Sequence, residues 1–175
     1  MSSIPAATRP LTAIRPETPG DFASIEALHE KAFGPGRFAK GAYRVRERAD
    51  PVPELAFVAT DAGTLIGSVR FSRVTIGGES ALFLGPLAID PAFAGQGLGV
   101  ALMVQSLALA EGLSATYCVL VGDLAYYARV GFKPVPPGRV VFPAPVDPAR
   151  LLWHPLNRPE DTAPPVGNLE GARVA

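Results

Sequence analysis

The chain has 175 residues, of which 48% are hydrophobic, which is enough to bury a single core. Its 16 basic and 16 acidic side chains give a net charge of zero, so charge provides no reason to expect nucleic acid or a membrane surface as a partner. The single cysteine, Cys118, excludes an intrachain disulfide framework, and we expect it to be a buried thiol. The sequence shows neither a signal-peptide pattern nor an apolar run of transmembrane length, which predicts a cytoplasmic protein.

The spacing of apolar and turn-forming residues predicts the order of the elements. Strands are expected at residues 11–15, 55–60, 64–76, 82–89, 115–121, 132–135 and 151–156. Helices are expected at residues 21–33, 37–49, 100–110 and 124–130, and a proline-rich loop at residues 134–148. This order predicts an α+β fold with a mixed, mostly antiparallel sheet and helices on both faces. We expect residues 1–10 to be flexible, residues 11–156 to form one domain, and residues 157–175, which are polar with Pro and Gly, to be disordered.

A glycine-rich loop joins a predicted strand to a predicted helix. Asp90-Pro91 ends the strand, and Gly95, Gly97 and Gly99 lead directly into the helix. The first N–H groups of a helix lack partners and, together with the helix dipole, favour an anion such as a phosphate. The Lys and Ser/Thr of a P-loop are absent, and the spacing fits a dinucleotide fingerprint only loosely. Two interpretations are open: a phosphate cradle, or a tight turn that binds nothing.

An aromatic segment follows the next predicted strand. Tyr126 and Tyr127 lie on a short predicted helix, Gly131 occupies its C-cap position, and Phe132 begins another extended segment.

Together the loop and the aromatic segment resemble the GNAT superfamily of N-acetyltransferases, in particular its small single-domain bacterial-type members. The loop resembles the family's pyrophosphate loop, Q/R-x-x-G-x-G/A, with Gly97 and Gly99 as the motif glycines and Ala94 where Gln or Arg is usual. The segment from Tyr127 to Phe132 resembles its F/Y-Y-x-x-x-G-F element. The resemblance implies a GNAT-type sheet with splayed central strands and a single acyltransferase domain over residues 11–156.

Gly85-Pro86 interrupts the predicted strand at residues 82–89. Because proline cannot donate to a sheet ladder, we expect this strand to bulge or splay there. In GNAT folds two strands separate at this place, and the pantetheine arm of coenzyme A lies between them. The alternative is a structural bulge with nothing bound.

The resemblance implies acetyl-CoA as the cosubstrate and Tyr127 as the acid that protonates the departing thiolate. The backbone N–H of Leu87 is the candidate donor to the thioester carbonyl, and Tyr126 is expected to be a packing residue. No paired metal ligands occur at useful spacing, so no metal is implied. The candidate acetyl-CoA-binding residues are Leu87, Ala88, Ile89, Ala94, Gly95, Gln96, Gly97, Leu98, Gly99, Val100, Asp123 and Tyr127.

The implied activity is acetyl transfer from acetyl-CoA to a primary amine of a small molecule or a protein, in a chain that can also form a homodimer. The strand before the loop lacks the glutamate that many family members carry. This absence and Ala94 favour the alternative, a non-catalytic domain that binds acetyl-CoA as a sensor or interaction module. The remaining candidates for the general base are His29, Glu30, Glu79, Asp123 and His154.

Arg37, Lys40, Arg44 and Arg48 follow i, i+3 and i+4 steps on the predicted helix at residues 37–49. In GNATs the first two helices and their connection help to form the acceptor side, so such a stripe would select an acidic acceptor. The alternative, which we expect, is that the stripe is the solvated face of a helix. Trp153 and the proline-rich loop are further candidates for shaping an acceptor pocket.

Overall fold

The computed structural model describes residues 12–174, with the backbone alone at positions 38 and 39. The strands are β1 Ala13–Pro16, β2 Phe57–Asp61, β3 Thr64–Ile76, β4 Glu79–Ile89, β5 Tyr117–Val121, β6 Lys133–Pro134, β7 Val140–Val141, β8 Leu151–Pro155 and β9 Gly167–Gly171. The α-helices are α1 Phe22–Phe33, α2 Gly41–Glu47, α3 Leu98–Ala110 and α4 Leu124–Tyr127. None of the helices in the described part of the chain is long and apolar enough to cross a membrane.

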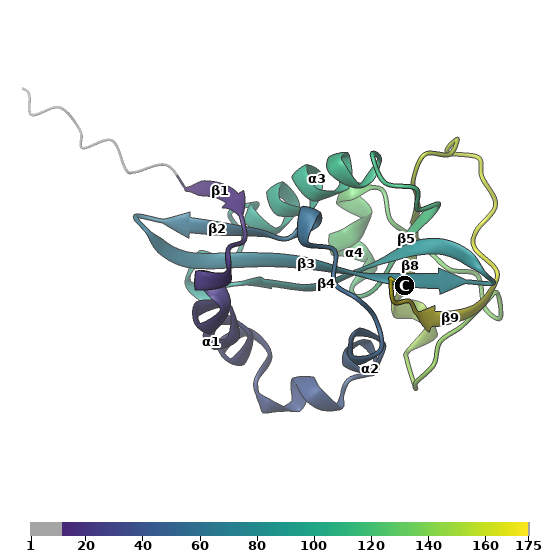
Figure 1. Ribbon diagram of the computed structural model, residues 1–175, viewed down its shortest axis with the longest axis horizontal. Helices are drawn as coiled ribbons and strands as arrows, with labels where there is room; N and C mark the ends of the chain where they lie inside the picture. The colour runs from purple at the N-terminus through teal and green to yellow at the C-terminus, as the bar shows by residue number, and fades with distance from the viewer. Residues whose placement is uncertain (1–11, 175) are drawn as a thin grey trace, which may run out of the picture.

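The strands form one mixed sheet between two layers of helices. Its main path runs β1-β2-β3-β4-β5-β8-β6, and β9 pairs with β3 and β7. The pairs β4–β5 and β7–β9 are parallel, and the other described strand pairs are antiparallel. Helices α1 and α2 lie on one face and α3 and α4 on the other (Figure 1). The predicted α+β architecture is therefore confirmed.

Each face of the sheet buries its own apolar cluster. Leu102 and Met103 of α3 pack with Phe71 on one face, whereas Val45 of α2 packs with Phe83 on the other. The Cys118 thiol is fully buried, and burial raises its pKa well above the usual range, as expected for a core thiol.

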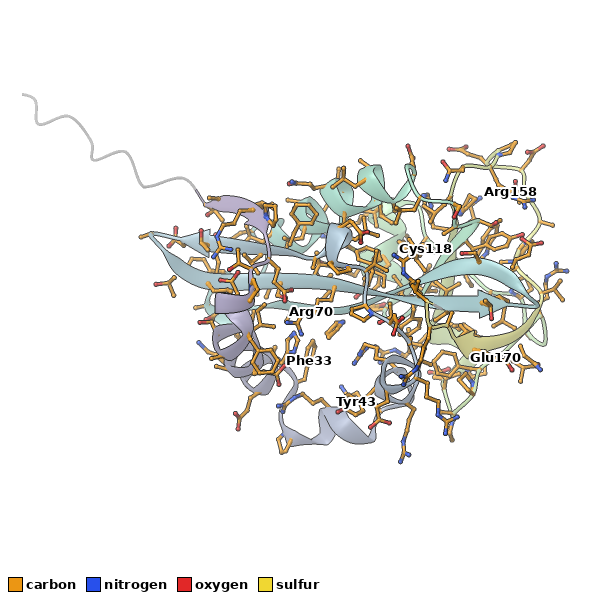
Figure 2. The ribbon with its side chains drawn as sticks, in the orientation of Figure 1. Phe33, Tyr43, Arg70, Cys118, Arg158 and Glu170 are labelled. Carbon is orange, nitrogen blue, oxygen red and sulfur yellow. The ribbon has the colours of Figure 1, made fainter. Side chains whose placement is uncertain are left out.

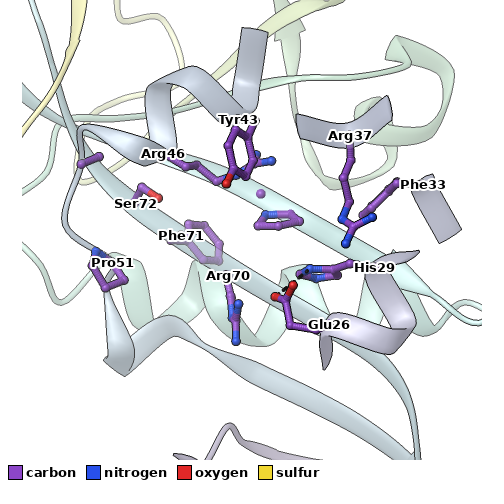
Figure 3. A pocket seen from close by; sticks show the side chains of 13 residues that line it. Glu26, His29, Phe33, Arg37, Tyr43, Arg46, Pro51, Arg70, Phe71 and Ser72 are labelled. Atoms are coloured by element: carbon purple, nitrogen blue, oxygen red, sulfur yellow. Dashed lines mark ion pairs between the residues drawn. The ribbon is translucent and has the colours of Figure 1, made fainter. Parts of the chain in front are cut away.

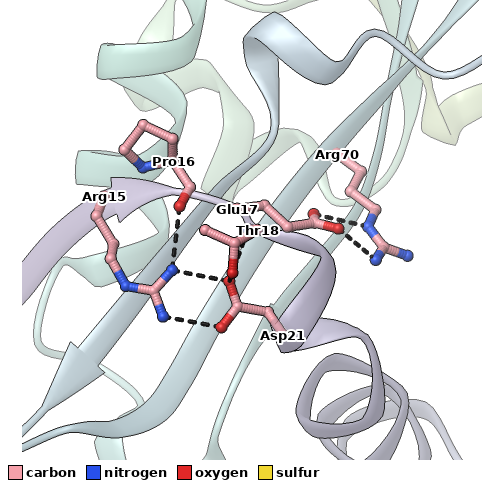
Figure 4. Close-up of polar contacts among 6 residues, drawn as sticks. All are labelled: Arg15, Pro16, Glu17, Thr18, Asp21 and Arg70. Atoms are coloured by element: carbon pink, nitrogen blue, oxygen red, sulfur yellow. Dashed lines mark hydrogen bonds and ion pairs between the residues drawn. The ribbon is translucent and has the colours of Figure 1, made fainter.

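Two bidentate ion pairs fix the connection between β1 and α1 (Figure 4). Arg15 donates to both carboxylate oxygens of Asp21 at 2.7 and 2.8 Å, and this guanidinium holds the pKa of Asp21 well below its usual range. Arg70 of β3 donates to Glu17 at 2.9 and 2.7 Å. The start of α1 is thereby tied to the middle of the sheet.

Strand β4 bulges at Gly85-Pro86, as predicted. Between Leu84 and Leu87 it carries these two residues, whereas β3 carries only Arg70 between their partners. On its other edge, β4 pairs with β5 only from Ala81 to Phe83. The two central strands therefore separate at the bulge, which confirms the predicted splay.

The helix predicted at residues 37–49 is not continuous. Pro35–Ala39 forms a 3-10 turn, η2, and Lys40 is extended before α2 begins at Gly41. The predicted basic stripe therefore does not form one helix face. Arg37 belongs to η2, Lys40 to the connection, Arg44 to α2, and Arg48 to its C-terminal cap.

The prediction of a disordered tail over residues 157–175 is wrong where β9 forms. This strand pairs antiparallel with Val74, Thr75 and Ile76 of β3 and buries Leu169 against the α2 side of the sheet. The proline-rich loop predicted at residues 134–148 also contains a short strand, β7, which pairs with β9. The predicted flexible segment 1–10 lies outside the described residues.

If β9 is an integral strand, Leu169→Ala should lower the free energy of unfolding by about 2–5 kcal/mol, since Leu169 is only 1% exposed. Val166→Ala is the matched control, because Val166 lies just before the strand and is 61% exposed, and a surface change should cost less than about 0.5 kcal/mol. Urea unfolding of both variants measures the difference. Equal stabilities would contradict a packed β9.

Candidate functional site

The glycine-rich loop has the geometry that its sequence indicates. Gly95 and Gly97 have φ angles of 76° and 79°, in the left-handed region that favours glycine. Helix α3 starts at Leu98, and its first helical hydrogen bond runs from the Ala101 N–H to the Gly97 carbonyl at 3.0 Å. The N–H groups of the three preceding residues therefore have no acceptor within the helix. They lie beside the exposed residues 94–97, where an anion can reach them.

Gly99 has a different reason to be glycine. It is buried in the first turn of α3 with ordinary helical backbone, and a Cβ there would collide with the Tyr126 hydroxyl. The missing side chain lets α4 pack closely against the start of α3. Tyr126 packs against the core cluster of the α3 face, in line with its predicted packing role, and its hydroxyl lies beside the loop.

A cavity of about 790 Å³ occupies the gap between the separated strands. One wall is residues 83–87 of β4, and another is residues 121–123 at the end of β5. Tyr126 and Tyr127 of α4 close one side, and Arg37 and Arg46 reach it from the other helical layer. Residues 145–147 of the proline-rich loop also line this cavity. Trp153, the other candidate for shaping an acceptor pocket, is buried in the core instead.

Tyr127 lies on the wall of this cavity, which we call the larger cavity. Its ring packs edge-on against Phe132, with the centroids 6.1 Å apart, and lies so close to Gly122 that no side chain would fit there. Burial, followed by the neighbouring Tyr126, raises the pKa of Tyr127 to about 12. The hydroxyl is therefore protonated at neutral pH and able to donate a proton.

A second, smaller cavity of about 240 Å³ lies on the α1 and α2 face of the sheet. Figure 2 shows Phe33, Tyr43 and Arg70 on this face, and Figure 3 shows the cavity from close by. It meets the larger cavity at the bulge, because Phe33, Arg37, Arg46, Gly85 and Pro86 line both.

His29 of α1 lines the smaller cavity and is 5% exposed. Its Nδ1 is 3.9 Å from Glu26 Oε1, while its Nε2 is buried without a hydrogen-bond partner in the described structure. Burial, followed by the charges of Arg70, Arg46 and Arg37, lowers the pKa of His29 to about 4. The imidazole is therefore neutral at neutral pH.

Arg46 of α2 is the site residue that the sequence analysis missed. It lies off the predicted stripe, yet its guanidinium lies against Gly85, where the two cavities meet. Burial lowers its pKa to about 10. Within residues 12–174 no carboxylate pairs with the Arg46 guanidinium, and the neighbouring Tyr43 offsets only part of the effect of burial on its pKa. Tyr43 and Arg46 both face the smaller cavity (Figure 3). In the sequence, only the three-residue spacing between them could have indicated that they share a helix face.

The predicted base candidates separate clearly in space. His29 lines the smaller cavity, and Asp123 lines the larger one while capping α4 through the Ala125 N–H at 3.2 Å. Glu79 pairs with Arg158 at 3.5 Å, and the His154 ring contacts the Gly131 carbonyl at 3.2 Å. Glu30 is exposed and lines neither cavity.

The candidate binding residues fall on two sides of the splay. Leu87 lines the larger cavity with Asp123 and Tyr127, and residues 88–89 continue the free edge of β4 toward the loop at residues 94–100. Among residues 12–174, the structure brings together no group of three or more His, Cys, Asp or Glu side chains that would hold a metal ion.

Comparison with known proteins gives consistent matches. Residues 53–134 match a family model described as an acetyltransferase (GNAT) domain. The chain is 38% identical over 123 residues to the uncharacterized N-acetyltransferase YhbS of Escherichia coli K12, a match that covers 69% of this chain and 72% of the relative.

Solved structures agree with the sequence matches. A crystal structure of Escherichia coli YhbS in complex with CoA is similar with a TM-score of 0.78 and 30% identity, over 98% of this chain and 94% of that one. A GNAT family acetyltransferase from Brucella melitensis in complex with acetyl-CoA is similar with a TM-score of 0.67 and 29% identity, over 93% and 96% of the two chains.

Proposed function

Because the chain belongs to the GNAT acetyltransferase family, we propose that it transfers the acetyl group of acetyl-CoA to a primary amine of a small molecule or a protein. The observation that carries this proposal is the larger cavity, which opens where β4 leaves β5 and has the glycine-rich loop beside it. We infer the cytoplasm as the compartment.

The residues present fit acetyl-CoA in both of its parts. The N–H groups of Leu98, Gly99 and Val100, and the left-handed loop at Gly95 and Gly97, offer donors to a pyrophosphate. The free edge of β4 at residues 87–89 offers backbone groups to an extended amide-bearing arm, as an added strand would use them. Acetyl-CoA supplies the acetyl group as a thioester.

In the transfer, the amine nitrogen forms a bond to the acetyl carbon, and the bond from that carbon to sulfur breaks. Leu87 lies on the wall of the cavity, and its N–H is the proposed donor to the carbonyl oxygen. Tyr127 gives its proton to the departing sulfur, and the proton lost by the amine passes to water in the open cavity. Holding the two reactants together contributes most of the acceleration.

The deciding experiment is a free-thiol release assay over a broad panel of amines. We expect sustained thiol release from acetyl-CoA that depends on one class of amine. If the protein binds acetyl-CoA by calorimetry but turns over with no acceptor, it is the non-catalytic sensor or interaction module instead.

Gly97→Val should weaken acetyl-CoA binding by about 10- to 100-fold, because it distorts the left-handed loop that aims charge-assisted donors at the pyrophosphate. Gly63→Val is a matched control: Gly63 has a φ of 84°, open space around it, and a place in the β2–β3 turn far from the loop in sequence. Both variants should lose about 1–2 kcal/mol of stability from backbone strain. Unchanged affinity for a folded Gly97→Val protein would refute the pyrophosphate site.

Tyr127→Phe should lower kcat by about 10- to 100-fold, because a thiolate near pKa 8.5 gains only modestly from a proton donor. The KM for acetyl-CoA should stay nearly constant, since the ring and its packing remain. Tyr117→Phe, outside both cavities, is the control. A large loss in Tyr126→Phe with full activity in Tyr127→Phe would transfer the acid role to Tyr126.

A further inference from the structure

The charges around the smaller cavity are unbalanced. Arg70 is already neutralised, because Glu17 accepts both of its hydrogen bonds and the Glu26 carboxylate adds to the favourable field. Arg37 donates to the Gly34 carbonyl at 2.9 Å. The two carboxylates near the cavity therefore serve Arg70, and positive charge remains at Arg46.

Arg46 is costly to the protein by itself. The guanidinium is largely withdrawn from water, and the lowered pKa shows that this burial costs its charged form more than the neighbouring Tyr43 returns. Arginine presents a planar fork of donors that matches a carboxylate or a phosphate in two parallel hydrogen bonds. The place of the Arg46 guanidinium, against Gly85, puts such an anion where the two cavities meet.

His29 is a second, independent observation in the same cavity. Its Nε2 is buried and unpartnered, and buried polar groups in native proteins nearly always have a partner. Because Nε2 belongs to a neutral ring, it can accept from an amine or donate to an anion. It lies on α1, across the cavity from α2, so one ligand between the helices can satisfy both groups (Figure 3).

We propose that the smaller cavity is the acceptor site and that it selects small amines carrying an anionic group, a carboxylate or a phosphate, which Arg46 binds while His29 contacts the same molecule. This inference rests on the proposed acetyltransferase function and names its substrate class. The cavity volume of about 240 Å³ accommodates a small amine. Because Arg46 lies at the junction itself, the amine and the anion are separated by only a few bonds.

The test compares amines that carry an anionic group with matched amines that lack it. Alanine is paired with alaninamide, β-alanine with β-alaninamide, and phosphoethanolamine with ethanolamine, and a lysine-containing peptide represents protein amines. Thiol release gives kcat/KM, and calorimetry in the presence of CoA gives binding of each amine. The first two pairs report a carboxylate, and the third reports a phosphate.

For the wild-type protein, kcat/KM for the preferred anionic amine should exceed that for its neutral partner by about 10- to 100-fold, the worth of a charge-assisted hydrogen bond. Arg46→Gln should remove this preference mainly through KM for the acid, and Arg46→Lys should restore part of it. Arg44→Gln is the control of equal charge change, because Arg44 is exposed on α2 and lines neither cavity.

Further outcomes distinguish a failure of the acceptor proposal from a failure of the proposed acetyltransferase function. Arg46→Gln should unfold at or above the wild-type temperature, because it removes a charge that burial disfavours. A lower temperature with an unchanged acid preference would make Arg46 merely structural. Faster acetylation of neutral amines or the peptide than of every anionic amine would overturn the acceptor proposal alone. If thiol release is absent throughout, the acetyltransferase function fails, and calorimetry still decides the acceptor site: Arg46-dependent binding of an anionic amine supports it, and no binding overturns it.

Discussion

Pro86 has no N–H to give to a sheet ladder, and the arrangement of the whole site follows from that constraint. The strand that carries it bulges by one residue against β3 and stops pairing with β5 after Phe83. The gap that results is the larger cavity, and the smaller cavity meets it at Gly85 and Pro86. Without the bulge, β4 could continue its pairing with β5 beyond Phe83 and narrow this gap.

The charged residues near the bulge are organised around the same interruption. Arg70 lies opposite Gly85 and Pro86 of the bulge, and its bidentate pair with Glu17 ties the start of α1 to the sheet. That pairing occupies Glu17, while no carboxylate pairs with the Arg46 guanidinium within the described residues. The smaller cavity between α1 and α2 is therefore lined by arginines, and their charges together with burial keep His29 neutral.

On the α3 and α4 face of the sheet, Gly97 and Gly99 both shape the start of α3, but for different physical reasons. Gly97 provides a left-handed turn that exposes N–H groups, which is a local property of the backbone. Gly99 lacks a side chain so that Tyr126 can approach, which is a property of the packing of α4 on α3. Tyr126, which lines the larger cavity on this face, is therefore held against a helix start that local conformation and tertiary packing fix together.

The sequence by itself determined the features that depend on neighbouring residues: the α+β order, the glycine-rich turn into α3, and the bulge at Gly85-Pro86. It did not reveal β9, because a strand of Gly-Asn-Leu-Glu-Gly has one apolar residue and owes its order to pairing with β3, a partner distant in sequence. The sequence also did not reveal that Arg46 and His29 line the same cavity. Helical spacing describes a single helix, whereas the break at Lys40 turns α2 so that Arg46 faces inward and Arg44 stays exposed. Only the tertiary structure decided that Glu17 neutralises Arg70 and that Arg46 is left for a ligand. Electrostatic pairing depends on distance in space rather than on distance along the chain.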